Sequence, residues 1–376
     1  MANVSSSNGL EKYPKLRFPG FDEPWKTVRL SDVTSFRRQR TKSPKNVYVS
    51  TENLLQNFEG IVAYLDKDEV EGIAFMPGDT LLANIRPYLK KAWLASFEGI
   101  CSADVLAFSP EKITASFLYD IIARDCFIEY VMGGVKGSKM PRGDKAHILE
   151  YEFAIPKKSE QEKISAFLVS IDHRIKKQRE MIAVLKKYKR GVITYIFSGK
   201  CNKFAAETTW TEKILADLCC EFRSGRNISA SLITETGEYA VYGGNGIRGY
   251  CDHYSHEGEY VVVGRQGALC GNVRLIQGKN YLSEHAIAVQ ANDENDTKFL
   301  LFLLYFMKLG QYSDQGAQPG LAVNKLLKLK CTVPDKEIQS KIASFLLNID
   351  LQISNHEKML SFLVDQRKAF LQQLFI

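Results

Sequence analysis

The chain has no hydrophobic run long enough to cross a membrane. Its strongest apolar stretch, Phe299–Met307, is less than half of the roughly 20 residues that a membrane span requires. The N-terminal residues MANVSSSNGLEKY contain no apolar core and no cleavage pattern, so we expect no signal peptide. These absences predict a cytoplasmic protein that makes no membrane contact.

Metal-site and disulfide patterns are also missing. The eight cysteines are scattered without a C-x-x-C pair, and none of the six histidines stands at the spacing of a zinc site. We therefore expect reduced and mostly buried thiols. The segment Cys251–His256, which also contains an aspartate, is the one alternative metal cluster, and we expect no metal there.

The motifs of several enzyme classes are missing as well. The chain contains no P-loop, no G-x-G-x-x-G between a strand and a helix, and no N-P-P-[FYW] or D-P-P-[FYW] motif of the kind that positions an amine for methylation. The D-x-K sequence at Asp296–Lys298 lies in a polar loop, where a helix cap is the better interpretation than a nuclease site. We predict a non-catalytic binding protein that holds no cofactor of its own.

What the chain does contain is an internal repeat. Residues 155–175, IPKKSEQEKISAFLVSIDHRI, align without a gap with residues 333–353, VPDKEIQSKIASFLLNIDLQI. The period is far too long for a solenoid, so the repeat indicates a duplicated module of two parts.

Each copy of the repeat has the pattern of a long helix with a narrow apolar seam. Apolar residues follow one another at alternating spacings of four and three, which is the heptad pattern of a coiled coil. Polar residues interrupt both copies at equivalent places, first at Gln178 and His356 and then at Lys189 and Arg367. The two seams comprise Ile164, Leu168, Ile171, Ile175, Gln178, Ile182 and Leu185, and Ile342, Leu346, Ile349, Ile353, His356, Leu360 and Leu363.

The matched interruptions predict that the two helices pack as an antiparallel coiled coil in one fixed alignment, because a polar seam residue sets the register. Two independent amphipathic helices, each on its own domain, are the alternative. The first helix is expected from about Glu160 to Phe197. A capping-box pattern at Ser159 and Glu162 marks its start, and Asp335 can cap the second helix.

Most of the net charge of +7 lies on the first helix. Residues 160–200 carry ten Lys and Arg against four Asp and Glu. Such a basic stripe suits contact with phosphates or with an acidic partner, although a solvated helix face would have the same composition. The stripe comprises Lys176, Lys177, Arg179, Lys186, Lys187, Lys189 and Arg190.

The segments before and between the helices follow one plan. In each, short β-like runs with glycine turns precede a helix candidate, at 113–132 and at 297–310, and a final glycine loop. We predict a mixed α/β (α+β) fold with a pseudo-twofold internal repeat, in which two globular domains alternate with two long helices. The predicted boundaries are an N-terminal arm at 1–17, a first domain at 18–155, a helical spacer at 156–200, a second domain at 201–333 and a second spacer at 334–376.

Several loops of both domains carry side chains suited to DNA. Arg can donate two hydrogen bonds to a guanine edge, Asn and Gln can pair with an adenine edge, and Lys suits phosphate. For each residue, an ordinary role at the surface or in a turn is the alternative. The candidates are Arg86, Tyr88, Lys90, Lys91, Lys139 and Arg142 in the first domain, and Arg223, Arg226, Asn245, Arg248, Arg265, Gln266 and Gln318 in the second.

The whole pattern resembles the specificity subunit of a Type I restriction-modification system. The resemblance rests on I-P-x-x-x-x-Q-x-K-I-x-x-F-L-x-x-I-D and its V-P partner, on the opening KLRFPGFDEPW, and on YGGNGIRGY followed by VVVGRQGALCGNV. The glutamate before the repeated glutamine is present at Glu160 but replaced by Ile338 in the second copy. The two helix starts are therefore not expected to do identical work.

The resemblance implies a role in host defence. Each domain would be a target-recognition domain that binds one half of a bipartite, asymmetric site in double-stranded DNA. Two DNA adenine methyltransferase subunits would dock on the helices, and restriction and translocase subunits would join them to cut unmodified DNA. S-adenosylmethionine, ATP and Mg would be bound by these partner subunits. A scaffold whose paired domains bind proteins, and a self-contained DNA-modifying enzyme, are the alternatives.

Overall fold

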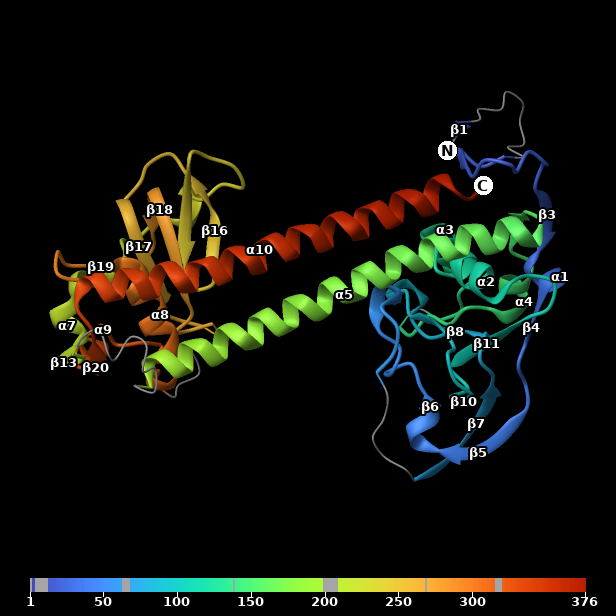
Figure 1. The fold of residues 1–376 in the computed structure, drawn as a ribbon, viewed down its shortest axis with the longest axis horizontal. Helices are drawn as coiled ribbons and strands as arrows, with labels where there is room; N and C mark the ends of the chain where they lie inside the picture. The colour runs from blue at the N-terminus through green and yellow to red at the C-terminus, as the bar shows by residue number, and fades with distance from the viewer. Residues whose placement is uncertain are drawn as a thin grey trace. The chain divides into compact units, whose positions relative to one another are not determined.

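The computed structural model of the chain forms two compact units, which are described separately. Unit 1 comprises Met1–Lys177 with Leu360–Ile376, and unit 2 comprises Gln178–Met359. Each unit holds one α/β domain, the first part of one long helix and the last part of the other (Figure 1). The structure describes residues 2–3, 13–62, 68–137, 139–198, 209–267, 269–314 and 320–376.

The domain of unit 1 combines small sheets with short helices. Its strands are β1 (Ala2–Asn3), β2 (Leu16–Arg17), β3 (Lys26–Arg29), β4 (Thr34–Phe36), β5 (Arg40–Pro44), β6 (Tyr48–Val49), β7 (Glu69–Phe75), β8 (Thr80–Ala83), β9 (Ala92–Leu94), β10 (Gly99–Cys101), β11 (Val105–Pro110) and β12 (Glu152–Ile155). Its helices are α1 (Leu30–Val33), α2 (Ala115–Ile122), α3 (Asp125–Gly133) and α4 (Lys145–Leu149), with 3₁₀ turns η1 (Lys45–Val47), η2 (Gln56–Phe58) and η3 (Pro87–Leu89).

An antiparallel sheet with the strand order β4-β11-β8-β9 lies at the centre of this domain, and α2 and α3 pack against it. A second sheet has the order β5-β7-β10-β6, and β3 pairs with β12. The helix expected at 113–132 is two helices. Arg124 has extended backbone, with φ −113° and ψ 146°, which ends α2 and starts α3.

Unit 2 repeats this plan around one larger sheet with the order β14-β19-β17-β18-β15-β16. The first four of these strands correspond to β4-β11-β8-β9, and the pairing of β13 with β20 corresponds to that of β3 with β12. The strands are β13 (Thr211–Ile214), β14 (Cys219–Ser224), β15 (Tyr239–Gly243), β16 (Gly246–Cys251), β17 (His256–Gly264), β18 (Val273–Leu282), β19 (Ala286–Ala291) and β20 (Lys330–Val333). The helices are α7 (Leu215–Leu218), α8 (Thr297–Phe306) and α9 (Val323–Leu326), with η4 (Ala230–Leu232) and η5 (Leu309–Tyr312).

The two long helices are α5 (Lys158–Phe197) and α10 (Lys336–Gln373). Asp335 caps α10 as predicted, because its Oδ1 accepts a hydrogen bond from the Ile338 N–H at 3.0 Å. Asp296 caps α8 in the same way, with the Phe299 N–H at 2.9 Å, which agrees with the interpretation of the D-x-K sequence. No helix among the described residues is long and apolar enough to cross a membrane.

The capping box predicted for the first helix is wrong. Because α5 begins at Lys158, Ser159 lies inside the first turn. The backbone carbonyl of Lys157 instead accepts hydrogen bonds from the N–H groups of Glu160 and Gln161, at 3.0 and 3.1 Å. A serine one residue inside the helix still fits the sequence pattern, so the pattern alone could not place the boundary.

The seams of α5 and α10 pack against each other within each unit. In unit 1, Ile171 and Ile175 form a buried cluster with Leu363. In unit 2, Ile193 and Ile196 share the main core with Ile342. The predicted seam residues Ile164, Leu168, Ile171, Ile175, Ile182, Ile342, Leu346, Ile349, Ile353 and Leu363 are buried, and Leu185 and Leu360 are partly buried.

The first pair of polar interruptions, Gln178 and His356, is joined by a hydrogen bond in unit 2. Gln178 donates a hydrogen bond from Nε2 to the His356 carbonyl oxygen at 2.9 Å, and the same Nε2 lies 2.7 Å from His356 Nδ1. Lys189 forms an ion pair with Asp350. Residue numbers therefore rise along α5 as they fall along α10, which confirms the predicted antiparallel coiled coil.

The second pair of interruptions, Lys189 and Arg367, is not paired in this way, because Lys189 belongs to unit 2 and Arg367 to unit 1. Arg367 instead pairs with Asp172 in unit 1, with Nη2 and Oδ2 3.0 Å apart. Asp172 and Asp350 are equivalent residues of the repeat. The basic interruption of each helix therefore pairs with the repeated aspartate of the other helix.

The repeated glutamine anchors each long helix to its neighbouring domain. In unit 1, Gln161 donates from Nε2 to the Pro156 carbonyl oxygen at 2.9 Å and accepts the Thr114 N–H at 2.9 Å, where Thr114 caps α2. In unit 2, Gln339 accepts the N–H of Asp296, the cap of α8, at 3.0 Å. Duplicated hydrogen bonds thus explain why this glutamine occurs in both copies.

A buried carboxyl also links α2 to α5 in unit 1. Asp120 is 3% exposed, and its Oδ2 accepts a hydrogen bond from Ser165 Oγ at 2.7 Å. Burial raises the pKa of Asp120 to about 7, and the nearby Asp172 carboxylate also raises this pKa, whereas the Ser165 hydroxyl and the Arg367 guanidinium oppose the rise.

Asp120→Asn should remove a pH dependence from the stability of unit 1. A carboxyl whose pKa is higher in the folded state stabilises the fold below its unfolded pKa of about 4, and this contribution is lost as the pH rises through about 7. Relative to the variant, the free energy of unfolding of the wild type should fall by roughly 2 kcal/mol between about pH 5 and pH 7. Urea unfolding of both proteins across this range measures the difference, and parallel pH profiles would contradict it.

Candidate nucleic-acid interface

Two loops of unit 1 bring together four of the predicted DNA-reading side chains. The loop after β8 carries Arg86 and Tyr88, and the loop before α4 carries Lys139 and Arg142. Ile85 forms an isolated antiparallel bridge with Arg142, which joins the loops through their backbones. All four candidate side chains are exposed. They therefore lie on adjoining loops at one surface of the domain.

The other two candidates of unit 1, Lys90 and Lys91, are used inside the unit. Lys90 Nζ lies 2.7 Å from Asp125 Oδ1, and this hydrogen bond lowers the pKa of Asp125 below its usual value. Lys91 Nζ donates to the carbonyl oxygen of Thr51 at 2.7 Å. These contacts hold the loop that carries Arg86 in place.

The same pairing of loops recurs in unit 2. Gln266, which follows β17, forms an isolated antiparallel bridge with Gly320. The strand β17 corresponds to β8, so this bridge corresponds to the one between Ile85 and Arg142 in unit 1. The backbone frame is shared, whereas the side chains on it differ.

Arg265 and Gln266 are positioned by their neighbours. Arg265 donates from Nη1 to the Glu284 carbonyl oxygen at 3.3 Å, and Gln266 Oε1 lies 2.7 Å from His285 Nδ1. Both side chains are half-buried, so a neighbour can hold each one before any ligand binds. Gln318 lies outside the described residues.

A hairpin of β15 and β16 presents Asn245 and Arg248, which are both exposed. Its turn requires Gly246, whose φ is +104°. A Cβ at this position would also come within 2.7 Å of Arg274 Nη1. The glycine therefore leaves room for the Arg274 guanidinium beside the hairpin.

The last two candidates of unit 2 are Arg223 on β14 and Arg226 just after it. Arg223 is exposed, and its Nε lies 2.7 Å from Oε1 of Glu221, whose side chain is only 13% exposed. Arg226 is exposed, and its backbone forms a parallel bridge with Ser283. This bridge places Arg226 near the segment that holds Arg265 and Gln266.

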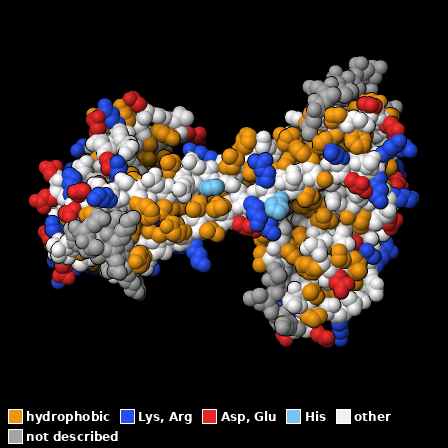
Figure 2. Space-filling view, viewed as in Figure 1, with side chains coloured by type: hydrophobic (Ala, Val, Ile, Leu, Met, Phe, Trp, Pro, Cys, Tyr) orange, Lys and Arg blue, Asp and Glu red, His pale blue; other side chains and the backbone are white. Residues whose placement is uncertain are grey.

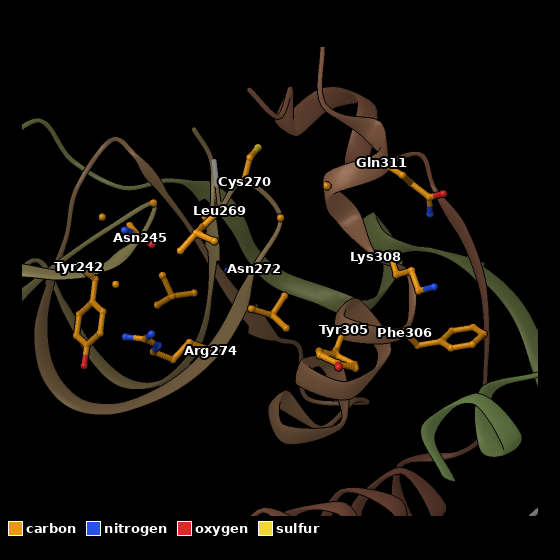
Figure 3. Close-up of a pocket in the computed structure, with 18 of the residues that line it drawn as sticks. Tyr242, Asn245, Leu269, Cys270, Asn272, Arg274, Tyr305, Phe306, Lys308 and Gln311 are labelled. Atoms are coloured by element: carbon orange, nitrogen blue, oxygen red, sulfur yellow. The ribbon is translucent and has the colours of Figure 1, made fainter. Parts of the chain in front are cut away.

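A hollow of about 760 Å³ lies beside the hairpin, lined by residues from α5, β15–β18, α8 and η5 (Figure 3). Three cations line it, namely Arg190 from α5, Arg274 from β18 and Lys308 after α8, and no Asp or Glu occurs in its lining as described. Figure 3 shows Tyr242 and Arg274 on the strand side, opposite Tyr305 and Lys308. No local sequence pattern indicated Arg274 or Lys308 as site residues.

The basic stripe of α5 is partly neutralised by α10 in unit 2. Lys186 Nζ lies 2.6 Å from Glu357 Oε1, and Lys189 pairs with Asp350.

Apolar side chains are exposed on the same helices, as Figure 2 shows in orange. In the described part of the chain, no group of three or more His, Cys, Asp and Glu could hold a metal ion.

Comparison with known proteins assigns both halves of the chain to one family. The family model for the Type I restriction modification DNA specificity domain matches residues 22–187 and 207–361. The EcoprrI specificity subunit from Escherichia coli is 46% identical over 134 residues, which are 35% of this chain and 33% of that protein. The EcoDI specificity subunit from Escherichia coli is 22% identical over 168 residues, which are 43% of this chain and 37% of that protein. The matched stretches thus span well under half of these relatives.

Solved structures share the fold over nearly the whole chain. The S subunit of a Type I restriction-modification system from M. genitalium superposes with a TM-score of 0.67 and 18% identity, covering 97% of this chain and 99% of the other. A chain from a structure described for assembly and conformational transition of a type I system gives a TM-score of 0.58 and 17% identity, covering 96% and 98%. Because the family model matches most of both halves, the chain belongs to the Type I restriction modification DNA specificity domain family.

Proposed function

We propose that the protein is the DNA-specificity subunit of a Type I restriction-modification complex, in which each domain binds one half of a bipartite, asymmetric site in double-stranded DNA. The observation that carries this proposal is the recurrence of one loop pairing with different side chains. Ile85 bridges Arg142 in unit 1, and Gln266 bridges Gly320 in unit 2. One frame with two side-chain sets suits two unlike half-sites.

The proposed DNA-reading domains span residues 18–155 and 201–333. Arg86 and Arg142 offer guanidinium donors for guanine edges, and Asn245 and Gln266 offer amides for adenine edges. The other exposed cations among the candidates suit phosphates, which position the protein without reading sequence. Lys90 and Lys91 contribute to this arrangement by holding their loop.

The helices are the proposed docking surface for two DNA adenine methyltransferase subunits. Exposed apolar side chains recur at equivalent positions of the two copies, with Met181 and Met359 each 46% exposed, Val184 61% and Phe362 55%. A recurring pair of apolar positions suits two copies of one partner, because large exposed apolar side chains often mark interfaces. S-adenosylmethionine would be bound by these subunits, and ATP and Mg by restriction subunits, so this chain is proposed to be non-catalytic.

Replacement of residues 18–150 by the corresponding segment of another family member should change one half of the methylated sequence and leave the other half unchanged. The chimaera would be expressed with the methyltransferase subunits of its own system, and methylated adenines would be mapped by long-read sequencing. The reciprocal replacement of residues 205–330 is the matched control and should change the other half. A change in both halves from one replacement, or no methylation at any bipartite site, would refute the proposal.

A further inference from the structure

We propose that the hollow of unit 2 holds phosphate groups of one DNA strand through Arg190, Arg274 and Lys308. This inference rests on the proposed function and assigns a backbone-binding site to the second domain in addition to its base-reading loops. The three cations come from three separate elements, α5, β18 and the segment after α8. A solvated helix face would place cations on one helix, so it does not explain three cations that come from three elements to line one hollow.

None of the three cations that line the hollow forms an ion pair in the described part of the chain. Lys186 and Lys189, on the same helix as Arg190, are instead paired with acids of α10. A concave wall focuses the field of such cations and raises the local concentration of anions. Phosphate is the anion that a DNA-binding protein meets at high density.

Neutral donors complete the hollow. The amide side chains of Asn272 and Gln311 line it together with several glycines. Gly271 packs so closely on Gly310 that a Cβ on Gly271 would lie 2.1 Å from the Gly310 backbone nitrogen. Walls of backbone and amide groups suit phosphate oxygens, which accept hydrogen bonds from both.

The positions of unit 1 equivalent to Arg274 and Arg190 do not hold free cations. Arg274 pairs with Val262 in the β17–β18 register, and Trp93 pairs with Leu81 at the corresponding place in the β8–β9 register. Trp93 packs on aromatic neighbours instead. Lys368 is the repeat equivalent of Arg190, and its Nζ lies 3.4 Å from Asp125 Oδ2. The proposed site therefore belongs to the second domain and makes the two domains unequal in how they hold the backbone.

Arg274→Ala and Lys308→Asn test the site in the full chain, alone and assembled with the methyltransferase subunits of its own system. Lys308 has φ +48°, and asparagine tolerates this left-handed backbone better than most residues. Binding of a mixed-sequence duplex would be measured between about 50 and 200 mM salt. Each variant should bind about tenfold more weakly and reduce the slope of log affinity against log salt by about one.

Lys330→Ala is the matched control, because it removes one exposed cation of the same unit outside the hollow and should leave the salt slope unchanged. Asn272→Asp places a negative charge in the hollow with almost no change in shape, and it should weaken duplex binding without altering the unfolding temperature. Inorganic phosphate would be titrated at constant ionic strength as a separate probe.

The outcomes separate the site from the function. If Arg274→Ala and Lys308→Asn kept the wild-type slope of log affinity against log salt, the inference would be overturned and the proposed function would stand. If these variants lost binding of inorganic phosphate but bound the duplex as the wild type does, the hollow would take a free anion. This result would overturn the assignment to a DNA strand. A wild-type chain that binds no duplex, alone or assembled, would overturn the proposed function itself.

Discussion

Glu160→Ala is expected to lower the free energy of unfolding of unit 1 by about 3–5 kcal/mol. Glu160 accepts two hydrogen bonds from Arg17, from Nε to Oε1 and from Nη2 to Oε2, both at 2.8 Å. The Arg17 side chain is only 6% exposed and the Glu160 side chain only 3%. The variant leaves the guanidinium buried with the Glu23 carbonyl oxygen as its remaining hydrogen-bond acceptor, and an uncompensated buried charge is costly.

The second copy of the repeat suggests the matched control. Ile338 takes the place of Glu160 there, and it is 4% exposed within the core of unit 2. The double variant Arg17→Met with Glu160→Ile should lose less than about 1 kcal/mol, because an apolar pair of similar volume can replace a buried ion pair. A double variant as unstable as Glu160→Ala would show that the charges themselves are required.

Urea unfolding can isolate this effect to unit 1. In a Trp210→Phe background, the two remaining tryptophans, Trp25 and Trp93, both belong to that unit, so their fluorescence reports on its unfolding. Trp25 packs edge-on against Phe117 in the same core as the start of α5. An unchanged midpoint for Glu160→Ala would contradict the prediction.

The helical part of the fold could be predicted because its determinants are local and repeated. Heptad spacing identified the seam, and the matched interruptions predicted one fixed alignment of the two helices, in which the structure shows Gln178 hydrogen-bonded to His356. The partners of Lys189 and Arg367 could not be found this way. Both bind an acid that lies outside the seam on the other helix, so the pairing depends on the relative shift of two helices rather than on spacing within one.

The candidate site was predictable only in part. The loops with Arg86 and Arg142 were chosen for residue type, and backbone pairing brings them together. Residue type could not show that Lys90 is held by Asp125, or that Arg142 lies 3.0 Å from Asp104 at the surface. Such partners are set by tertiary contacts between segments far apart in sequence.

The hollow shows the same limit more sharply. Arg274 lies near the start of β18, and only the sheet order, which places β18 between β17 and β15, brings it beside the turn at Gly246. Lys308 follows α8 in a left-handed conformation, with φ +48°, although it is not itself a glycine. A site assembled by strand order across a sheet leaves no motif in the sequence.

Gln339→Ala should lower the stability of the start of α10 by about 3 kcal/mol. Gln339 is 1% exposed and donates from Nε2 to Asn295 Oδ1 at 2.8 Å and to the Pro334 carbonyl oxygen at 2.9 Å. It also accepts the Asp296 N–H at 3.0 Å. Truncation leaves three polar groups without this partner in a buried place, and each unsatisfied group costs about 1–3 kcal/mol.

Amide hydrogen exchange of the full chain resolves this loss, because it reports opening of α10 separately from the rest. Exchange in residues 336–345 should accelerate by about a hundredfold, which corresponds to roughly 3 kcal/mol. Gln161→Ala is the parallel variant in unit 1, where the glutamine makes two such hydrogen bonds, so the start of α5 should be destabilised less. If both glutamines could be removed without faster exchange at either helix start, the anchoring of the long helices would have to come from apolar packing alone, and the duplicated glutamine would have no structural role.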